Sequence, residues 1–133
     1  NRTDMENIYI EHTSHTPEVY FDMEEHKLHI VGKSYPEDAS RFYEPVVAWL
    51  EGNISEIKDK FSVEFQFDYF NTSSSKYILR IFLILEDFKK AHPEVALSII
   101  WKYHPNDEEM MESGQEYQQF VTIPFEFVEE NKD

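Results

Sequence analysis

A run of hydroxyl-bearing residues stands at the boundary between two strongly patterned segments. Thr72 and the serines 73–75 follow a segment of alternating apolar and polar residues and precede a segment with helical spacing of apolar residues. A helix N-terminus presents unsatisfied backbone N–H groups and the positive end of the helix dipole, so an anion is stabilised there. The pattern therefore permits a phosphate switch at Thr72. The alternative is that Thr72 and the serines only cap the helix.

Charged residues on both sides bear on this hypothesis. Asp68 is expected on the polar side of the strand, where its carboxylate would repel a phosphate on Thr72 if it points that way. Lys76, one turn into the helix, would offset that repulsion. We expect the turn at Thr72 and the start of the helix to form a docking surface for a partner, made of Asn71, Ser73, Ser74, Ser75, Lys76 and Asp68.

Histidines and carboxylates are the other groups with chemical potential. Four histidines fall in or between expected strands without an HExxH pattern, and the chain has no cysteine: His12, His15, His26 and His29. We therefore expect no metal site and no thiol chemistry. Glu108 and Glu112 share a helical face, which indicates either a solvated surface or a docking patch. With only 3 Gly in the chain, no segment resembles a glycine-rich phosphate loop, so nucleotide binding by such a loop is not expected. We also expect no catalytic residue and no cofactor.

Composition narrows the class of protein further. The chain has 133 residues and a formal net charge of −15, which repels nucleic acid and anionic membrane surfaces. This charge either serves solubility alone or complements a basic surface of a partner. Its length suits one domain, residues 1–133. No apolar run is long enough to span a bilayer and the first residues are unlike a secretory signal, so a cytoplasmic protein is expected.

Short extended segments fill the first third of the chain. Strands are predicted at 7–10, 19–22 and 27–31, the last two joined as a hairpin with His29 pointing outward. A helix near 38–51 follows, with an apolar face that includes Trp49 and is made of Phe42, Val46, Trp49 and Leu50, flanked by Tyr43 and Val47. Pro45 inside it predicts a bend or a later start.

The clearest strand is 62–69, because Val63, Phe65, Phe67 and Tyr69 alternate strictly with polar residues. The following helix is placed near 73–91 and ends at His92-Pro93. Another strand, 95–103, has apolar residues on both faces and includes Trp101, for which we expect core packing, as for Trp49. A short helix or ordered loop at 105–117, a last strand near 123–128 and fraying from Glu129 complete the prediction.

A strand, a helix and a strand in this order imply parallel pairing of 62–69 with 95–103. The predicted fold class is therefore α/β, a single domain with a mixed sheet of about five or six strands covered mainly by two helices.

Four motifs in this order and spacing resemble SiaC-type regulatory phosphoproteins over about residues 16–127: Ser34-Tyr35-Pro36-Glu37, Tyr69-Phe70-Asn71-Thr72-Ser73-Ser74-Ser75-Lys76, Trp101-Lys102-Tyr103 and Glu112-Ser113-Gly114-Gln115-Glu116. The resemblance implies a fold like that of the STAS-type anti-sigma-factor antagonists and a phospho-acceptor at Thr72, with Ser73 to Ser75 as secondary candidates.

The same resemblance implies a non-enzymatic protein in a partner-switching circuit. A serine/threonine kinase and a metal-dependent, PP2C-type phosphatase would set its state, and the unphosphorylated form would engage an output protein such as a diguanylate cyclase. An anti-sigma-antagonist-like regulator of transcription is the alternative function, and a small enzyme is a third.

Overall fold

The computed structural model describes residues 5–131, and its centre is a six-stranded sheet in the order β1-β2-β3-β4-β5-β6. The strands are β1 (Tyr9–Ile10), β2 (Glu18–Asp22), β3 (Lys27–Ser34), β4 (Lys60–Phe70), β5 (Ala96–Tyr103) and β6 (Phe125–Glu129). The first three form antiparallel pairs, whereas β3 to β6 run parallel. The predicted α/β class, the mixed sheet, the hairpin and the parallel pairing of β4 with β5 are thus confirmed.

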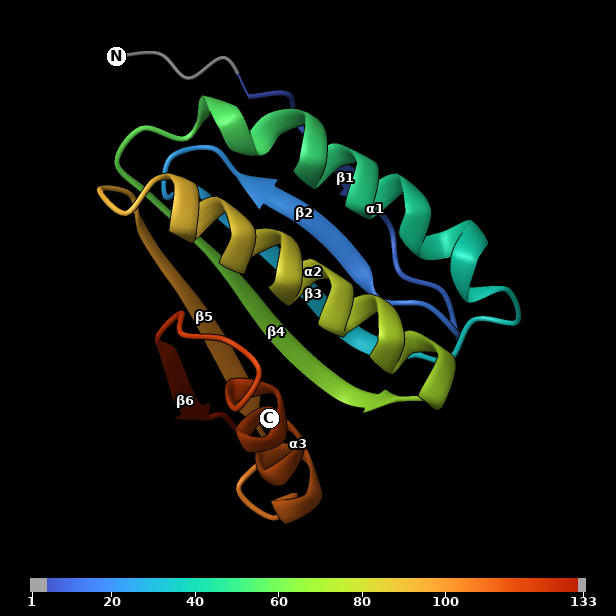
Figure 1. Ribbon diagram of the computed structural model, residues 1–133. Coiled ribbons are helices and arrows are strands. Elements are labelled where there is room, and N and C mark those ends of the chain that lie inside the picture. Colours follow the sequence, from blue (N-terminus) through green and yellow to red (C-terminus); the bar gives the residue numbers. More distant parts are fainter. Residues whose placement is uncertain (1–4, 132–133) are drawn as a thin grey trace.

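The helical layer covers one face of this sheet. Its helices are α1 (Ala39–Asn53), α2 (Thr72–Ala91) and α3 (Glu108–Gln118), with a short 3₁₀ turn at Ile54–Glu56. Figure 1 shows α1 and α2 side by side along the sheet, with the shorter α3 beside the end of β5. The ring of Tyr117 in α3 lies 5.0 Å from Phe82 in α2 and 5.8 Å from Trp101 in β5. Val46 and Leu50 of α1 belong to the same buried cluster, so all three helices share one core.

Alternation along the strands decides which side chains enter that core. In β3, Leu28 and Ile30 are fully buried, and in β4 Val63 and Phe65 are fully buried beneath the helices. The side chains between them point to the opposite face, which no helix covers within residues 5–131. This one-sided cover leaves a polar sheet face open.

The predictions for α1 are partly corrected. The helix starts at Ala39 with Asp38 as its N-cap and continues through Pro45, so the later start was wrong. Pro45 is tolerated because the carbonyl that loses its N–H partner belongs to Arg41, on an exposed part of the helix. Tyr43 is fully buried whereas Phe42 is only partly buried, so the centre of the apolar face is Tyr43.

Two strand predictions also change. Tyr69 was expected on the apolar face of β4, but its side chain is 54% exposed. The reason is a register shift between Gly32 and Lys33: Gly32 is opposite Phe67 and Lys33 is opposite Tyr69, so Asp68 is an extra residue in β4. At the C-terminus, β6 extends to Glu129, and the Glu130 N–H donates to the Tyr103 carbonyl at 2.8 Å. Fraying from Glu129 was therefore wrong as far as 130, and residues 132–133 lie outside the described residues.

Candidate functional site

The junction between β4 and α2 is the site that the sequence singled out. Asn71 is the N-cap of α2, and its side-chain oxygen accepts the Ser74 N–H at 2.9 Å. Thr72 is consequently the first residue of the helix rather than its cap. Because the first N–H groups of a helix have no partner within it, those of Thr72 and Ser73 are directed to the helix end beside the Thr72 side chain.

The hydroxyls of this junction differ sharply in access. Thr72 and Ser73 are exposed and Ser75 is partly buried. Ser74, in contrast, is fully buried: its hydroxyl bonds to the Ser34 hydroxyl at 2.8 Å and donates to the Ser34 carbonyl at 3.1 Å. A hydroxyl enclosed in this way cannot contact a partner, so Ser74 does not belong to the expected docking surface.

The Ser74 hydroxyl belongs to a buried cluster that fixes the junction. The Tyr43 hydroxyl from α1 bonds to Ser34 from β3, which in turn holds Ser74 in α2. Burial raises the pKa of Tyr43 to about 12, although the two serine hydroxyls oppose this shift. The tyrosine therefore stays neutral and can complete the hydroxyl cluster. The position of Thr72 is thus set by contacts with β3 and α1.

Further contacts hold the first turn of α2 from outside. The Asn71 N–H donates to the Ser34 carbonyl at 2.9 Å, and the Ser75 hydroxyl donates to the Thr72 carbonyl at 2.6 Å. The Tyr117 hydroxyl of α3 donates to the Ser75 carbonyl at 2.9 Å. Together with the Tyr43 contact from α1, the contacts from β3 and α3 therefore fix the short exposed stretch that carries Thr72.

The charged neighbours lie at the surface. Lys76 is exposed in the second turn of α2, and Asp68 is exposed in the β4 irregularity. The expected side of Asp68 is confirmed, since its side chain does not enter the core. Thr72, Lys76 and Asp68 are therefore all reachable by a partner.

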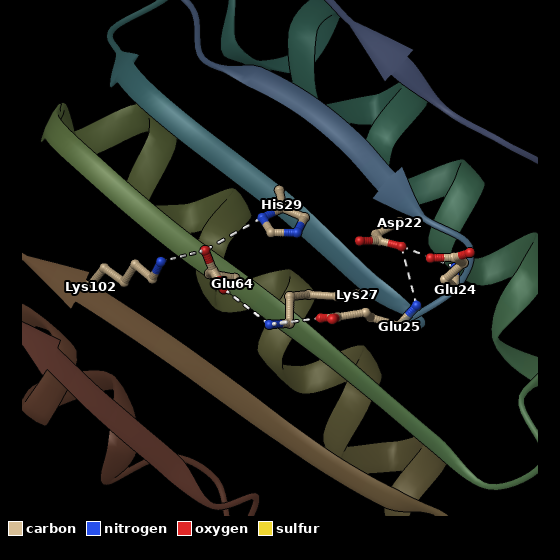
Figure 2. Close-up of polar contacts among 7 residues, drawn as sticks. All are labelled: Asp22, Glu24, Glu25, Lys27, His29, Glu64 and Lys102. Atoms are coloured by element: carbon tan, nitrogen blue, oxygen red, sulfur yellow. Dashed lines mark hydrogen bonds and ion pairs between the residues drawn. The ribbon is translucent and has the colours of Figure 1, made fainter. Parts of the chain in front are cut away.

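A second cluster of charged groups lies on the open face of the sheet, and sequence reasoning missed it. Figure 2 shows the Glu64 carboxylate of β4 between Lys27, His29 and Lys102, which come from β3 and β5. The distances from its oxygens are 3.4 Å to the Lys27 Nζ, 3.4 Å to the His29 Nδ1 and 3.0 Å to the Lys102 Nζ. Glu64 is only 5% exposed, so the lysine stems and the imidazole shield it from water.

The electrostatics of this cluster are those of a paired carboxylate. Burial acts to raise the pKa of Glu64, but Lys102, His29 and Lys27 outweigh it and hold that pKa below its usual range. Burial lowers the pKa of His29, against the opposing effect of Glu64. The cluster therefore ties three strands together in an ion-pair network. In the sequence Glu64 is one of several polar residues that alternate with the apolar residues of this strand, and its partners follow only from the parallel register.

The other residues considered for chemistry are separate from one another. Within residues 5–131, no group of three or more His, Cys, Asp or Glu side chains is arranged to hold a metal ion. Glu108 and Glu112 are exposed on α3. Trp49 and Trp101 are buried, and their indole N–H groups donate to the carbonyls of Glu6 and Met110, which confirms their core role.

No helix among the described residues is long and apolar enough to cross a bilayer.

The fold and this junction define a small single-domain α/β protein whose distinctive surface is a hydroxyl-rich strand-to-helix turn. The chain belongs to the SiaC family of regulatory phosphoproteins, because the family model matches residues 10–130. It is 27% identical over 121 residues to an uncharacterized protein of Pseudomonas aeruginosa, covering 91% of this chain and 94% of that protein.

Solved structures agree with this assignment. A structure of SiaC of P. aeruginosa has a TM-score of 0.84 at 25% identity, covering 95% of this chain and 100% of the other. The crystal structure of the diguanylate cyclase SiaD in complex with its activator SiaC, also from P. aeruginosa, contains a chain with a TM-score of 0.85 at 25% identity, covering 92% and 99%. The apo-SiaC crystal structure from that organism gives 0.81 at 24% identity, covering 93% and 99%, and supports the fold alone.

Proposed function

We propose that this chain is a non-enzymatic regulator whose binding to an output partner is controlled by phosphorylation of Thr72. The observation that carries the proposal is the position of Thr72: it is exposed and is the first residue of α2, on a turn fixed by the buried contacts of Ser74 and Tyr43. A kinase can reach such a hydroxyl, and the modified group sits on a rigid surface.

The physical effect of a phosphate at this position is direct. It adds close to two negative charges at the positive end of the α2 dipole, next to the N–H groups of the first turn. Lys76, one turn further along, attracts it as well. The helix therefore tolerates the phosphate, while the surface offered to a partner changes in charge and bulk.

A diguanylate cyclase is the output partner that we propose, because the relative SiaC from P. aeruginosa forms a complex with such an enzyme. A serine/threonine kinase and a PP2C-type phosphatase in the cytoplasm would set the state of Thr72. The unphosphorylated form would bind the cyclase, and the phosphate would abolish binding. In this role Asn71, Ser73, Ser75, Lys76 and Asp68 surround the contact, whereas Ser74 supports it from below.

Peptide mass spectrometry of the chain isolated from its own host tests the modification. We expect one phosphate on Thr72 that disappears in Thr72→Ala, and no phosphate on the buried Ser74. Ser73→Ala is the matched control, because it removes the neighbouring exposed hydroxyl and should leave the phosphate in place. Absence of phosphate from the chain under several growth conditions, or a phosphate that persists in Thr72→Ala, would refute the proposal.

A further inference from the structure

The longest interval of the sequence without a carboxylate side chain includes most of α2. Between Asp68 and Glu86 the chain has no Asp or Glu, although the whole sequence contains 27 of them. This interval covers the end of β4 and α2 from Thr72 to Leu85. Over its first turns α2 therefore has no negative side chain of its own that would repel a carboxylate of a partner.

A line of exposed side chains runs along this part of α2. Thr72, Lys76 and Leu83 are exposed, and their spacing places them above one another on one side of the helix. They span about 16 Å along the helix axis. In Figure 1, α2 is on the near side of the sheet, and no other element of residues 5–131 lies in front of it. The α2 stripe, made of Thr72, Lys76 and Leu83, is therefore accessible to a partner.

Lys76 is the available cation of the α2 stripe. None of the ion pairs within residues 5–131 includes Lys76. Arg80, one turn further along, is instead held by Glu44 of α1, with 2.9 Å between the Nη1 and Oε2 atoms. The charge of Arg80 is therefore already balanced, whereas the Lys76 ammonium can pair with a carboxylate of a partner.

Apolar surface adjoins this cation. Leu83 is 43% exposed, and Phe120, just after α3, is 62% exposed. The Thr122 N–H and hydroxyl donate to the Glu86 carboxylate at 2.9 and 2.8 Å, which fixes the segment that contains Phe120 beside the part of α2 that follows Leu83. Two exposed apolar side chains therefore lie on neighbouring segments, and an apolar partner segment would remove both from water.

We propose that the α2 stripe is the docking surface for an apolar segment of the output partner that carries a carboxylate. The apolar side chains of this segment cover Leu83 and Phe120, and its carboxylate pairs with Lys76. The chain has a net charge of −15, so carboxylates on other parts of its surface repel the same segment. Charge therefore favours docking on α2 over docking elsewhere.

This inference rests on the proposed function and gives the phosphate a physical means of abolishing binding. Thr72 and Lys76 are four residues apart in α2 and are therefore neighbours on its surface. A phosphate on Thr72 attracts the Lys76 ammonium and places close to two negative charges beside the carboxylate of the partner. Both effects weaken the docking of an acidic segment. A basic segment at this place would instead bind more tightly after phosphorylation, against the proposed regulation.

Calorimetry with the diguanylate cyclase of the host measures the dissociation constant of the unphosphorylated chain and of its variants. Leu83→Ala should weaken binding about 3- to 10-fold, because the partner loses an apolar contact. Met23→Ala is the matched control: Met23 is 40% exposed in the turn between β2 and β3, and its loss should change the affinity less than about twofold. If Leu83→Ala binds as tightly as Met23→Ala, the docking surface is refuted.

The charge of the partner segment is tested at Lys76. Lys76→Gln should weaken binding about 3- to 5-fold, and Lys76→Arg, which keeps the charge, should stay within about twofold of the wild type. Lys90→Gln is the matched control, because Lys90 is an exposed lysine in the last turn of the same helix. Unchanged or tighter binding by Lys76→Gln would overturn the pairing with a carboxylate.

The chain with phosphothreonine at position 72 separates this inference from the proposed function. If the phosphate weakens binding while the Leu83 and Lys76 variants bind as the wild type does, the switch stands and the docking surface is refuted. If those variants bind weakly and the phosphate has no effect, control by Thr72 is refuted instead. If the wild type binds no cyclase, both fail. Thermal unfolding of each variant should stay within a few degrees of the wild type, which shows that the variants are folded.

Discussion

Replacing Gly114 by alanine tests how closely α3 is packed against the sheet. An added Cβ would lie 2.5 Å from the Trp101 Cδ1, 2.7 Å from its Nε1 and 2.8 Å from the Phe127 Cε1. Trp101 is fully buried, and its N–H donates to the Met110 carbonyl at 2.8 Å. The indole therefore cannot move aside without losing this hydrogen bond and its core contacts.

The magnitude follows from two opposing effects. Alanine in a helix is favoured over glycine by about 1 kcal/mol, whereas an extra carbon in a packed core costs about 1–3 kcal/mol and occasionally more. Contacts under 3 Å to a fixed ring place the cost at the upper end. We therefore expect Gly114→Ala to lower the free energy of unfolding by about 1–2 kcal/mol.

Gly52→Ala is the matched control, because nothing lies within 4 Å of a Cβ at this position in α1. It should stabilise the protein by about 0.5–1 kcal/mol. Urea unfolding followed by far-UV circular dichroism gives both values, and the difference between the variants isolates the steric cost in α3. If Gly114→Ala is as stable as Gly52→Ala, the close approach of α3 to Trp101 is refuted.

Two further changes test the buried polar groups. Glu64→Gln should lower the free energy of unfolding by about 1–3 kcal/mol at pH 7, because Lys27 and Lys102 lose their charged partner. The pKa of Glu64 is held below its value in the unfolded chain, so this stabilisation is present above about pH 4.3 and is lost as the pH falls through the folded pKa; urea unfolding should show the difference between variant and wild type shrinking as the pH falls below about 4.3. Tyr43→Phe should cost about 0.5–1.5 kcal/mol, whereas Tyr77→Phe, whose hydroxyl meets the exposed Glu44 carboxylate at 3.3 Å, should cost under about 0.5 kcal/mol. Burial raises the pKa of Tyr43 to about 12, so the wild type, unlike Tyr43→Phe, should lose stability from this group between about pH 10 and pH 12.

The arrangement of the sheet and helices could be predicted from the sequence because local patterns and connection rules agree. The alternation in β4 and the helical spacing in α2 are strong signals, and the order strand, helix, strand fixes the parallel pairing. The pattern of α1 was also clear. Pro45 predicted a bend or a later start, but the helix begins at Ala39, and Tyr43 and Val46 beside the proline are buried in the core.

The details of the site were less accessible to sequence reasoning. The alternation of residues in β4 does not indicate that Asp68 is an extra residue, because this irregularity depends on how β4 pairs with Gly32 and Lys33 in β3. Similarly, Ser74 is one of several hydroxyls in a row, and only the position of Ser34 and Tyr43 shows that it is buried. Contacts between distant segments decide these features, and a single sequence does not encode them as a local pattern.

Binding of the cyclase to both forms of the chain tests the central claim most directly. The chain is made with phosphothreonine at position 72 and, separately, with unmodified Thr72, and the affinity of each for the host's diguanylate cyclase is measured by calorimetry. We expect the unmodified chain and Thr72→Ala to bind alike, and the phosphorylated chain to bind at least about 10-fold more weakly. Equal affinities for the phosphorylated and unmodified chains would contradict the account.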